Sequence, residues 1–475
     1  MVAFYEEEFF VKISLVNAPA YQIFEPRYDT PPFTRLGLAY LAGYLRAHGD
    51  YDCQLVDAKF ERLNEQKTVE RILSHHPQVV GLTAFTNEIK SAYKVAVRLK
   101  ALHPEIIIII GGTHISAIPE QTMEEFPFFD YGCMGEGEET LLEFCETLKR
   151  GDSMAGVRGI IYREGGKIIQ NAIRVPIADQ NSIPIPAWDL FPPGSEWLIM
   201  SSRGCPFTCN FCMNPNGRLV RPRTPEHLLS ELIWLYETYG ANHFWFCDEI
   251  FTVNRPRTLE ICKAIIRSKL HRKIRWFAQT HVSCVDGELL SLMKEAGCYR
   301  IGLGIETGDE EKLKVMGKKT SIEKILKARA AALFAKLPIE SYFIIGQPNE
   351  TYESAKLTID FAVKLNPEIP IFGIMVPYPG TKVAEMAANS EGGYVLRSID
   401  WNDFNKQLGN ALEFKNLSRW ELEKLQAMGY LKVFLYNRRF KDLSLFIWKY
   451  RVEARHLFLN LILKRFQKRK WSTKN

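Results

Sequence analysis

Short apolar segments alternate with helical patterns twice along this chain of 475 residues. In the first 150 residues, strand-like runs are separated by segments whose apolar residues recur at helical spacing. Because a strand–helix–strand order requires parallel pairing, this part predicts a doubly wound parallel sheet of the flavodoxin-like type. The expected strands are 11–16, 53–56, 79–84, 106–110 and 131–134, and the expected helices are 36–47, 64–74, 88–102 and 138–149.

A second series of strand–helix units occupies residues 195–390. Six such units predict an open (β/α)6 barrel, and the chemistry of parallel barrels lies at the carboxyl ends of their strands. The expected strands are 197–201, 243–247, 274–279, 299–305, 339–345 and 371–376. Residues 11–150 and this barrel are expected to be joined by a linker, 151–194, with a hairpin and a proline-rich crossing, and residues 400–475 are expected to form a helical, basic C-terminal region.

Three cysteines, Cys205, Cys209 and Cys212, lie within eight residues and have the spacing C-x3-C-x2-C. Three thiolates can hold three irons of a cubane cluster and leave the fourth open, whereas ferredoxin-type carriers use four cysteines. A zinc site would need a fourth ligand, and His227 is too distant in sequence to be an obvious partner. A disulfide would need an oxidising compartment, and Met1–Phe10 shows no secretory signal. The pattern therefore favours an iron–sulfur cluster with one open iron.

This segment, with an aromatic residue before its last cysteine, resembles the radical S-adenosylmethionine (SAM) enzymes. In that family the three cysteines hold a [4Fe-4S] cluster, and SAM chelates the open iron and is cleaved to a 5′-deoxyadenosyl radical. Acidic residues at strand ends suit the SAM amino and ribose groups, although such residues also often cap the following helix. The resemblance implies SAM contacts from Phe211, Asp248, Glu249 and Glu306.

The first 150 residues resemble the cobalamin-binding domain that precedes the radical module in one large class of these enzymes. The runs Val56-Asp57-Ala58, Gly111-Gly112-Thr113-His114 and Gly135-Glu136-Gly137-Glu138 carry the likeness. Many cobalamin domains have an Asp-x-His-x-x-Gly run whose histidine ligates cobalt, but here the run begins Asp57-Ala58-Lys59, without that histidine. Two alternatives stay open: a solvated loop position for His114, and a domain that has lost its ligand. The resemblance implies cobalamin contacts from Thr83, Gly111, Gly112, His114, Glu136 and Gly137.

Positive charge is concentrated at the C-terminus, although the net charge of the whole chain is only +6. Residues 431–475 hold 13 Lys and Arg against 2 Asp and Glu. A helix expected at about 442–469 has an apolar face with basic flanks, which fits an interfacial helix on an anionic membrane; a packed helix with a solvated basic end is the alternative. A second basic run, 312–319, is interpreted as a solvated helix end because its glycine spacing does not fit a phosphate loop.

No recognised nucleic-acid-binding module accompanies this charge, and no apolar run is long enough to span a membrane. We therefore expect a cytoplasmic protein without a nucleic-acid partner, with peripheral contact at the inner face of the membrane as an option.

The resemblance implies a cobalamin-dependent radical SAM enzyme, and in the commonest family outcome such an enzyme methylates an unactivated carbon. The substrate would be a small molecule or a lipid, and the electron would come from a reducing partner such as flavodoxin or ferredoxin. Cyclisation of a tetrapyrrole and rearrangement of a hopanoid lipid are alternatives within the same architecture. A radical enzyme that uses its front domain only as a scaffold, and a cobalamin- or cluster-based sensor without catalysis, are further alternatives. The sequence identifies neither the substrate nor a catalytic acid or base.

Overall fold

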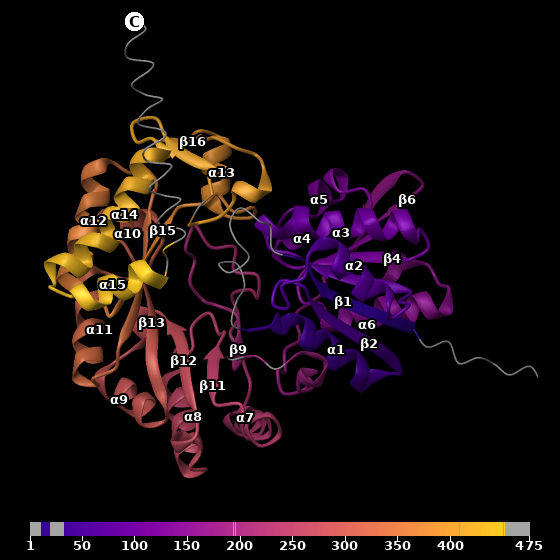
Figure 1. The fold of residues 1–475 in the computed structure, drawn as a ribbon, viewed down its shortest axis with the longest axis horizontal. Coiled ribbons are helices and arrows are strands. Elements are labelled where there is room, and N and C mark those ends of the chain that lie inside the picture. Colours follow the sequence, from indigo (N-terminus) through magenta and orange to yellow (C-terminus); the bar gives the residue numbers. More distant parts are fainter. Residues whose placement is uncertain are drawn as a thin grey trace, which may run out of the picture.

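Two sheets, each built mainly of parallel strands, lie side by side in the computed structural model of the chain (Figure 1). The structure describes residues 11–19, 33–192, 194, 196–407, 409–449 and 451. The first sheet, in indigo and purple, is built from the N-terminal third of the chain, and the second, in magenta and orange, follows it. Both sheets carry helices that the chain forms between successive strands.

The first sheet has the strand order β2-β1-β3-β4-β5-β6-β7. Its five parallel strands have the order of a flavodoxin-like sheet, with the topological switch point between β1 and β3. The predicted hairpin of the linker is present as β6 and β7, but it pairs antiparallel with β5 and so extends this sheet. The strands are β1 (Val11–Asn17), β2 (Tyr51–Asp57), β3 (Val79–Thr83), β4 (Ile107–Gly111), β5 (Tyr131–Cys133), β6 (Ile160–Glu164) and β7 (Lys167–Gln170).

Helices cover both faces of the first sheet because its strands are apolar on both sides. Leu15 and Val79 belong to the core that contains α1 and α6, whereas Val16 and Val80 belong to the core that contains α2 and α3. The four predicted helices are confirmed as α1 (Leu36–His48), α2 (Glu65–Leu73), α3 (Ile89–Leu102) and α6 (Glu138–Arg150). Two short helices after β4, α4 (Thr113–Ala117) and α5 (Pro119–Glu125), are additional to the prediction.

The second sheet has the order β15-β14-β13-β12-β11-β8, and every neighbouring pair is parallel. This arrangement confirms the open six-stranded barrel. Its strands are β8 (Trp197–Ile199), β11 (His243–Phe246), β12 (Arg275–Thr280), β13 (Cys298–Glu306), β14 (Ile339–Ile345) and β15 (Ile369–Ile374). The helices between the strands are α7 (Pro225–Tyr239), α8 (Arg255–Arg267), α9 (Gly287–Glu295), α10 (Glu310–Val315), α11 (Ile322–Phe334) and α12 (Tyr352–Leu365).

The linker packs against α1 of the first sheet, and its apolar side chains connect the core of that sheet with the core of the barrel. The amide of Ala187 donates to the carbonyl of Ala39 in α1 at 2.9 Å. A side chain at Gly43 would place its Cβ 2.7 Å from the Ile185 carbonyl oxygen, so α1 needs glycine at this crossing. Trp188 and Trp197 then stack edge to face, with ring centroids 5.3 Å apart. One continuous apolar core therefore runs from α1 into the second sheet.

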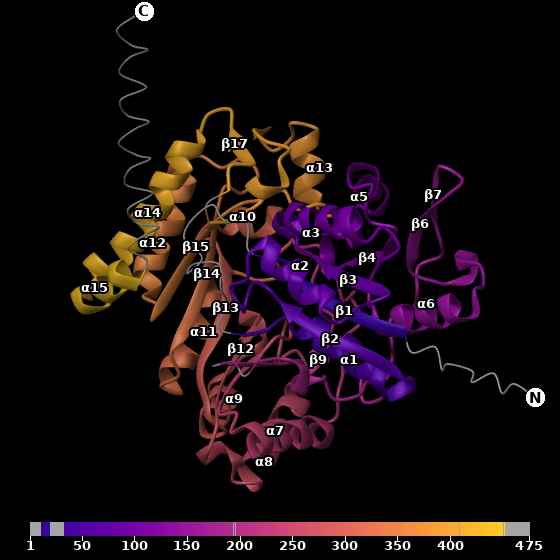
Figure 2. The same ribbon diagram turned by 45° about the vertical axis from the view of Figure 1, so that its right-hand side comes forward.

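The helical C-terminal region is confirmed over residues 419–436 and 440–449, and a short pair of strands that was not predicted precedes it. A small antiparallel sheet joins β16 (Tyr394–Leu396) to β17 (Leu412–Phe414), and strands of three residues are too short to show a periodic pattern. Ser418 and Glu421 form a capping box where α14 (Arg419–Tyr436) begins. Figure 2 shows α14 beside α12 at the outer edge of the barrel. A short helix, α13 (Lys382–Ala388), lies before β16, and α15 (Phe440–Lys449) follows α14. Apart from α15 and Arg451, the predicted helix 442–469 lies outside the described residues.

Residues 400–404 return to the first sheet and cover His114. The Trp401 ring contacts the His114 ring edge to face at 4.9 Å, and Trp401 Nε1 donates to Glu125 at 2.6 Å. His114 is fully buried, so the alternative of a solvated loop histidine is wrong. Neither of its ring nitrogens has a hydrogen-bond partner among the described residues. Burial lowers the pKa of His114 from its ordinary value of 6.5 to about 4.

This buried histidine should make the protein sensitive to acid. Between pH 7 and pH 5 the unfolded chain takes up a proton at His114 and the folded protein does not, so folding loses about 2 kcal/mol of stability. We expect His114→Phe to remove that part of the loss, measured as urea unfolding by tryptophan fluorescence at both pH values. The exposed His103, changed to Gln, is the matched control and should keep the wild-type pH dependence. An identical pH dependence in His114→Phe and wild type would contradict this account.

Candidate active site

The cysteine loop is closed at its base by a short antiparallel pair of strands. Strand β9 (Ser202–Arg203) pairs with β10 (Arg221–Pro222), and the three cysteines lie on the loop between them. Gly204 has φ +101°, and a Cβ there would lie 2.2 Å from the Leu219 carbonyl oxygen. Only glycine can therefore turn the chain from β9 into the loop. The loop follows the first barrel strand, β8, at the carboxyl end of the sheet, as the sequence predicts.

Cys205, Cys209 and Cys212 lie together on this loop, and each thiol is at least partly exposed. Burial raises the pKa of all three, that of Cys209 to about 11. Opposing this, the backbone N–H of Phe207 stabilises the Cys205 thiolate, and Lys318 stabilises that of Cys209. Bound iron needs thiolates, so these donors favour the charge state that a cluster requires.

The geometry gives no support to the zinc alternative. Nowhere in the part of the chain that the structure describes do three His, Cys, Asp or Glu side chains converge as ligands of a single metal ion. His227, the one fourth ligand considered from the sequence, has its Nδ1 3.1 Å from Arg223 Nε, which donates to it. A cubane cluster has a different requirement, because each thiolate binds a different iron.

A buried lysine that the sequence analysis missed lies beside the cysteine loop. The turn after α10 packs on the loop, with the Asn210 amide donating to the Met316 carbonyl at 3.0 Å. The side chain of Lys318, only 7% exposed, then donates from Nζ to Glu306 Oε1 at 2.6 Å. The interpretation of 312–319 as a solvated helix end is therefore wrong at Lys318. It is also wrong at Lys312, which is buried and donates to two backbone carbonyls.

Glu306 ends β13 in an unusual backbone conformation. Its φ is +67°, in the left-handed region that non-glycine residues rarely adopt. The conformation is held by the buried ion pair with Lys318 and by Gln347, whose amide donates to the Glu306 carbonyl at 3.2 Å. Strained residues that their surroundings hold in place are concentrated at functional sites, which agrees with the predicted role of this position.

The neighbouring carboxylates Asp248 and Glu249 point in different directions. Asp248 is buried and accepts hydrogen bonds from the Ser201 amide at 2.7 Å and from the hydroxyls of Ser201 and Ser202, both at 2.6 Å. Glu249 instead accepts from the Gly204 amide at 3.2 Å and from the Asn216 side chain, both on the cysteine loop. Burial raises the pKa of both groups. Of the two, Glu249 is the one attached to the loop that carries the cysteines, and Phe211 lies on the same loop, half-buried.

Three of the predicted cobalamin residues lie together at the carboxyl edge of the first sheet. Thr83 ends β3 and is paired with Gly111 at the end of β4. Gly112 has φ +102°, and a Cβ there would lie 2.6 Å from the Ala84 carbonyl oxygen. Ligands of doubly wound sheets bind at this edge, and glycine permits close approach of a large ligand. Gly112 is thus required by the turn itself, and this edge is where a doubly wound sheet would hold cobalamin.

The other predicted cobalamin residues, His114, Glu136 and Gly137, follow β4 and β5 at the same edge, but their side chains or backbone are in contact with other parts of the protein. Lys59 stands where the cobalt-ligating histidine of the motif would be, and its ammonium pairs with Glu88 at 3.2 Å. Glu136 is engaged with the barrel, because its carboxylate pairs with Arg221 and Arg203. Gly137 begins the turn into α6 and lies against Leu41. His114 is buried beneath Trp401, as described above.

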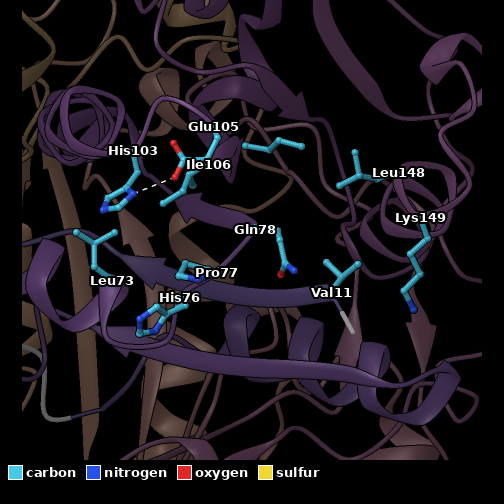
Figure 3. A pocket seen from close by; sticks show the side chains of 11 residues that line it. Val11, Leu73, His76, Pro77, Gln78, His103, Glu105, Ile106, Leu148 and Lys149 are labelled. Atoms are coloured by element: carbon cyan, nitrogen blue, oxygen red, sulfur yellow. Dashed lines mark hydrogen bonds and ion pairs between the residues drawn. The ribbon is translucent and has the colours of Figure 1, made fainter. Parts of the chain in front are cut away.

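A separate cavity of about 860 Å³ lies at the opposite, amino-terminal edge of the first sheet (Figure 3). Val11, Gln78 and Ile107 contribute to its wall, beside His103, whose ring bonds Glu105 at 2.9 Å. None of the predicted cofactor residues lines it.

Comparison with known proteins identifies both halves of the chain. The B12 binding domain matches residues 28–144, and the Radical SAM superfamily matches residues 199–362. An uncharacterized methyltransferase of Pyrococcus horikoshii is 32% identical over 90% of this chain and 93% of its own length. The anaerobic magnesium-protoporphyrin IX monomethyl ester cyclase of Rubrivivax gelatinosus is 32% identical over 72% of this chain and 64% of the cyclase.

Two solved structures share the fold. The radical SAM methyltransferase TsrM of Kitasatospora setae, with cobalamin and a [4Fe-4S] cluster bound, superposes with a TM-score of 0.72 at 17% identity, over 89% of this chain and 91% of TsrM. The cobalamin-dependent radical SAM enzyme OxsB superposes with a TM-score of 0.73 at 20% identity, over 88% of this chain and 66% of OxsB.

These matches agree with the two carboxyl edges and the cysteine loop described above. They set aside the cobalamin-free scaffold and the non-catalytic sensor, and they leave methylation, cyclisation and rearrangement as the reactions to be distinguished. The chain belongs to the cobalamin-binding radical SAM enzymes, with a [4Fe-4S] cluster, SAM and cobalamin as its cofactors.

Proposed function

We propose that this enzyme methylates an unactivated carbon of a small-molecule or lipid substrate by radical chemistry. The observation that carries the proposal is the position of the cysteine loop, which contacts Glu249 of the barrel and is joined at its base to Glu136 and Glu138 of the cobalamin-binding domain. Its support in the comparisons is the methyltransferase relative, which aligns over nearly its whole length. When bound, the cluster and SAM supply an adenosyl radical, and cobalamin supplies methyl-transfer chemistry.

In this proposal Cys205, Cys209 and Cys212 hold the cluster, and Phe211 lies beside the bound SAM. Glu249 would bind the SAM amino group, because a carboxylate forms charge-assisted hydrogen bonds with an ammonium. Asp248 would act one step away, since the serines already occupy its oxygens and through them it fixes the start of the loop.

Glu306 would accept hydrogen bonds from the ribose hydroxyls. Lys318 holds its carboxylate in place through an ion pair that is almost fully buried. Thr83, Gly111 and Gly112 would form the floor against which cobalamin lies, with His114 and Gly137 behind it. Glu136 is assigned no direct contact with cobalamin, since Arg221 and Arg203 occupy its carboxylate.

Cyclisation of a tetrapyrrole is the second candidate function, because the Rubrivivax cyclase shows the same percentage identity as the methyltransferase. The cyclase alignment covers a smaller share of both chains, which favours methylation. Either reaction needs one electron to reduce the cluster, and a flavodoxin or a ferredoxin fits that requirement as the reducing partner.

The two reactions differ in the products formed from SAM. We expect the anaerobically reconstituted protein, given SAM, reductant and a lipid-containing cell extract, to form 5′-deoxyadenosine and S-adenosylhomocysteine in parallel. Radical initiation gives the first product, and donation of a methyl group from a second SAM gives the second. Cys209→Ala should abolish 5′-deoxyadenosine, because an iron of the cluster loses its ligand; Cys262→Ala, a buried cysteine of α8 away from the loop, is the control. 5′-Deoxyadenosine without S-adenosylhomocysteine would favour cyclisation or rearrangement.

We also propose that α15 touches an anionic membrane. No helix among the described residues is long and apolar enough to cross a bilayer. Phe440 and Trp448 are 62% and 68% exposed, near Lys441 and Arg451, and exposed aromatic rings with cationic neighbours suit a membrane surface.

This contact predicts binding to vesicles that contain phosphatidylglycerol and weaker binding to pure phosphatidylcholine. Trp448→Ser should reduce the bound fraction severalfold in a sedimentation assay, because it removes an apolar anchor. Phe334→Ser, an exposed aromatic residue of α11 at 73% exposure, is the control and should bind as wild type does. Equal sedimentation with both kinds of vesicle would contradict membrane contact through this helix.

A further inference from the structure

The loop Gly135–Glu138 of the cobalamin-binding domain is joined to the cysteine loop by buried ion pairs. Arg203 pairs with Glu138 through Nη2 at 2.5 Å and with Glu136 through Nη1 at 3.4 Å. Arg221 forms two bonds with the Glu136 carboxylate, one of them at 2.9 Å from Nη1. The four side chains are between 5% and 10% exposed. Two carboxylates of one domain therefore face two guanidinium groups of the other, away from water.

Both arginines stand at the base of the cysteine loop. Arg203 and Arg221 are directly opposite each other in the β9–β10 pair. Arg203 is followed by Gly204, whose amide donates to Glu249 at 3.2 Å. Arg221 also donates to the backbone carbonyl of Asn216 at 3.1 Å, and the Asn216 side chain donates to the other oxygen of Glu249. Two polar paths thus begin at Glu138 and Glu136 and end on the same carboxylate.

The cost of burying these charges argues for a role in geometry. A buried ion pair is weak evidence of stabilisation, because removal from water offsets much of the attraction. An Arg–carboxylate fork does fix direction, since two parallel N–H···O bonds define both distance and angle. The continuous apolar core already joins the two domains, so the ion pairs are not needed merely to hold them together.

We propose that Glu136 and Glu138 are positioning residues for the SAM site: through Arg221 and Arg203 they set the base of the cysteine loop and the orientation of Glu249. This inference rests on the proposed role of Glu249 in binding the SAM amino group. It assigns to the cobalamin-binding domain a function in SAM binding besides cobalamin binding. The sequence likeness had instead placed Glu136 against cobalamin.

SAM binding to the full, cluster-loaded protein tests this directly. The EPR spectrum of the reduced cluster is recorded at increasing SAM concentration, without substrate, and the half-saturating concentration is read from the spectral change. We expect Glu136→Gln and Glu138→Gln each to raise that concentration about tenfold or more, because each change removes a charge-assisted hydrogen bond that is buried. The content of iron, sulfide and bound cobalamin should stay at the wild-type level.

A conservative change on the barrel side separates positioning from a loss of folding. Arg221→Lys keeps the positive charge and removes the fork, so it should weaken SAM binding as Glu136→Gln does. The Glu136→Gln/Arg221→Lys double variant should be no weaker than either single variant, since both changes act on one path. Glu139→Gln is the control and should bind SAM as wild type does, because Glu139 is 40% exposed and its ion pair, with Arg174 at 3.6 Å, does not involve the cysteine loop.

The outcomes distinguish this inference from the proposed function. If Glu136→Gln, Glu138→Gln and Arg221→Lys keep the half-saturating SAM concentration of the wild type, the positioning role is overturned and the proposed function stands. A wild-type cluster whose spectrum does not respond to SAM would instead overturn the proposed SAM site itself. Additive losses in the double variant would contradict a shared path.

Discussion

A buried contact joins two loops, one at the carboxyl edge of each sheet. Parallel sheets present their ligands at those edges, and the Glu136 and Glu138 carboxylates meet the Arg203 and Arg221 guanidinium groups between them. The edge where a doubly wound sheet would hold cobalamin and the loop that carries the cysteines therefore belong to one connected structure. Its polar contacts are directional, and its apolar core runs without interruption from α1 into the barrel.

Environment gives similar side chains different roles around the cysteine loop. Asp248 and Glu249 are adjacent in sequence, but three donors from Ser201 and Ser202 already satisfy Asp248, whereas Glu249 is bonded to the loop itself. Glu306 differs again, because it is paired with a buried lysine and held at a positive φ. Acidic residues at strand ends indicate where a ligand site lies. The neighbours of each carboxylate are needed to tell a carboxylate that is free to bind a ligand from one that holds the surrounding chain in place.

The strands of the two large sheets, the first-sheet helices and the cysteine loop could be predicted from the sequence because each has a local signal. Apolar runs between helical patterns identify β1 to β4, and the cysteine spacing identifies the loop. Lys318 could not be recognised, because its burial arises from the packing of the turn after α10 on a loop about a hundred residues earlier. The return of Trp401 to His114 is likewise a contact between distant segments. The family resemblance predicts a cobalamin contact for Glu136, but its arginine partners lie in the other domain, where no local pattern could reveal them.

The fate of the SAM methyl group is the most direct test of the central claim. Reconstituted protein is given SAM with a deuterated methyl group, together with the extract used to supply substrate, and all products are compared by mass spectrometry. Radical methylation predicts a new compound that carries the deuterated methyl group, formed in step with 5′-deoxyadenosine and absent with Cys209→Ala. Formation of 5′-deoxyadenosine without any deuterated product would contradict it and identify a cyclase or a rearrangement enzyme.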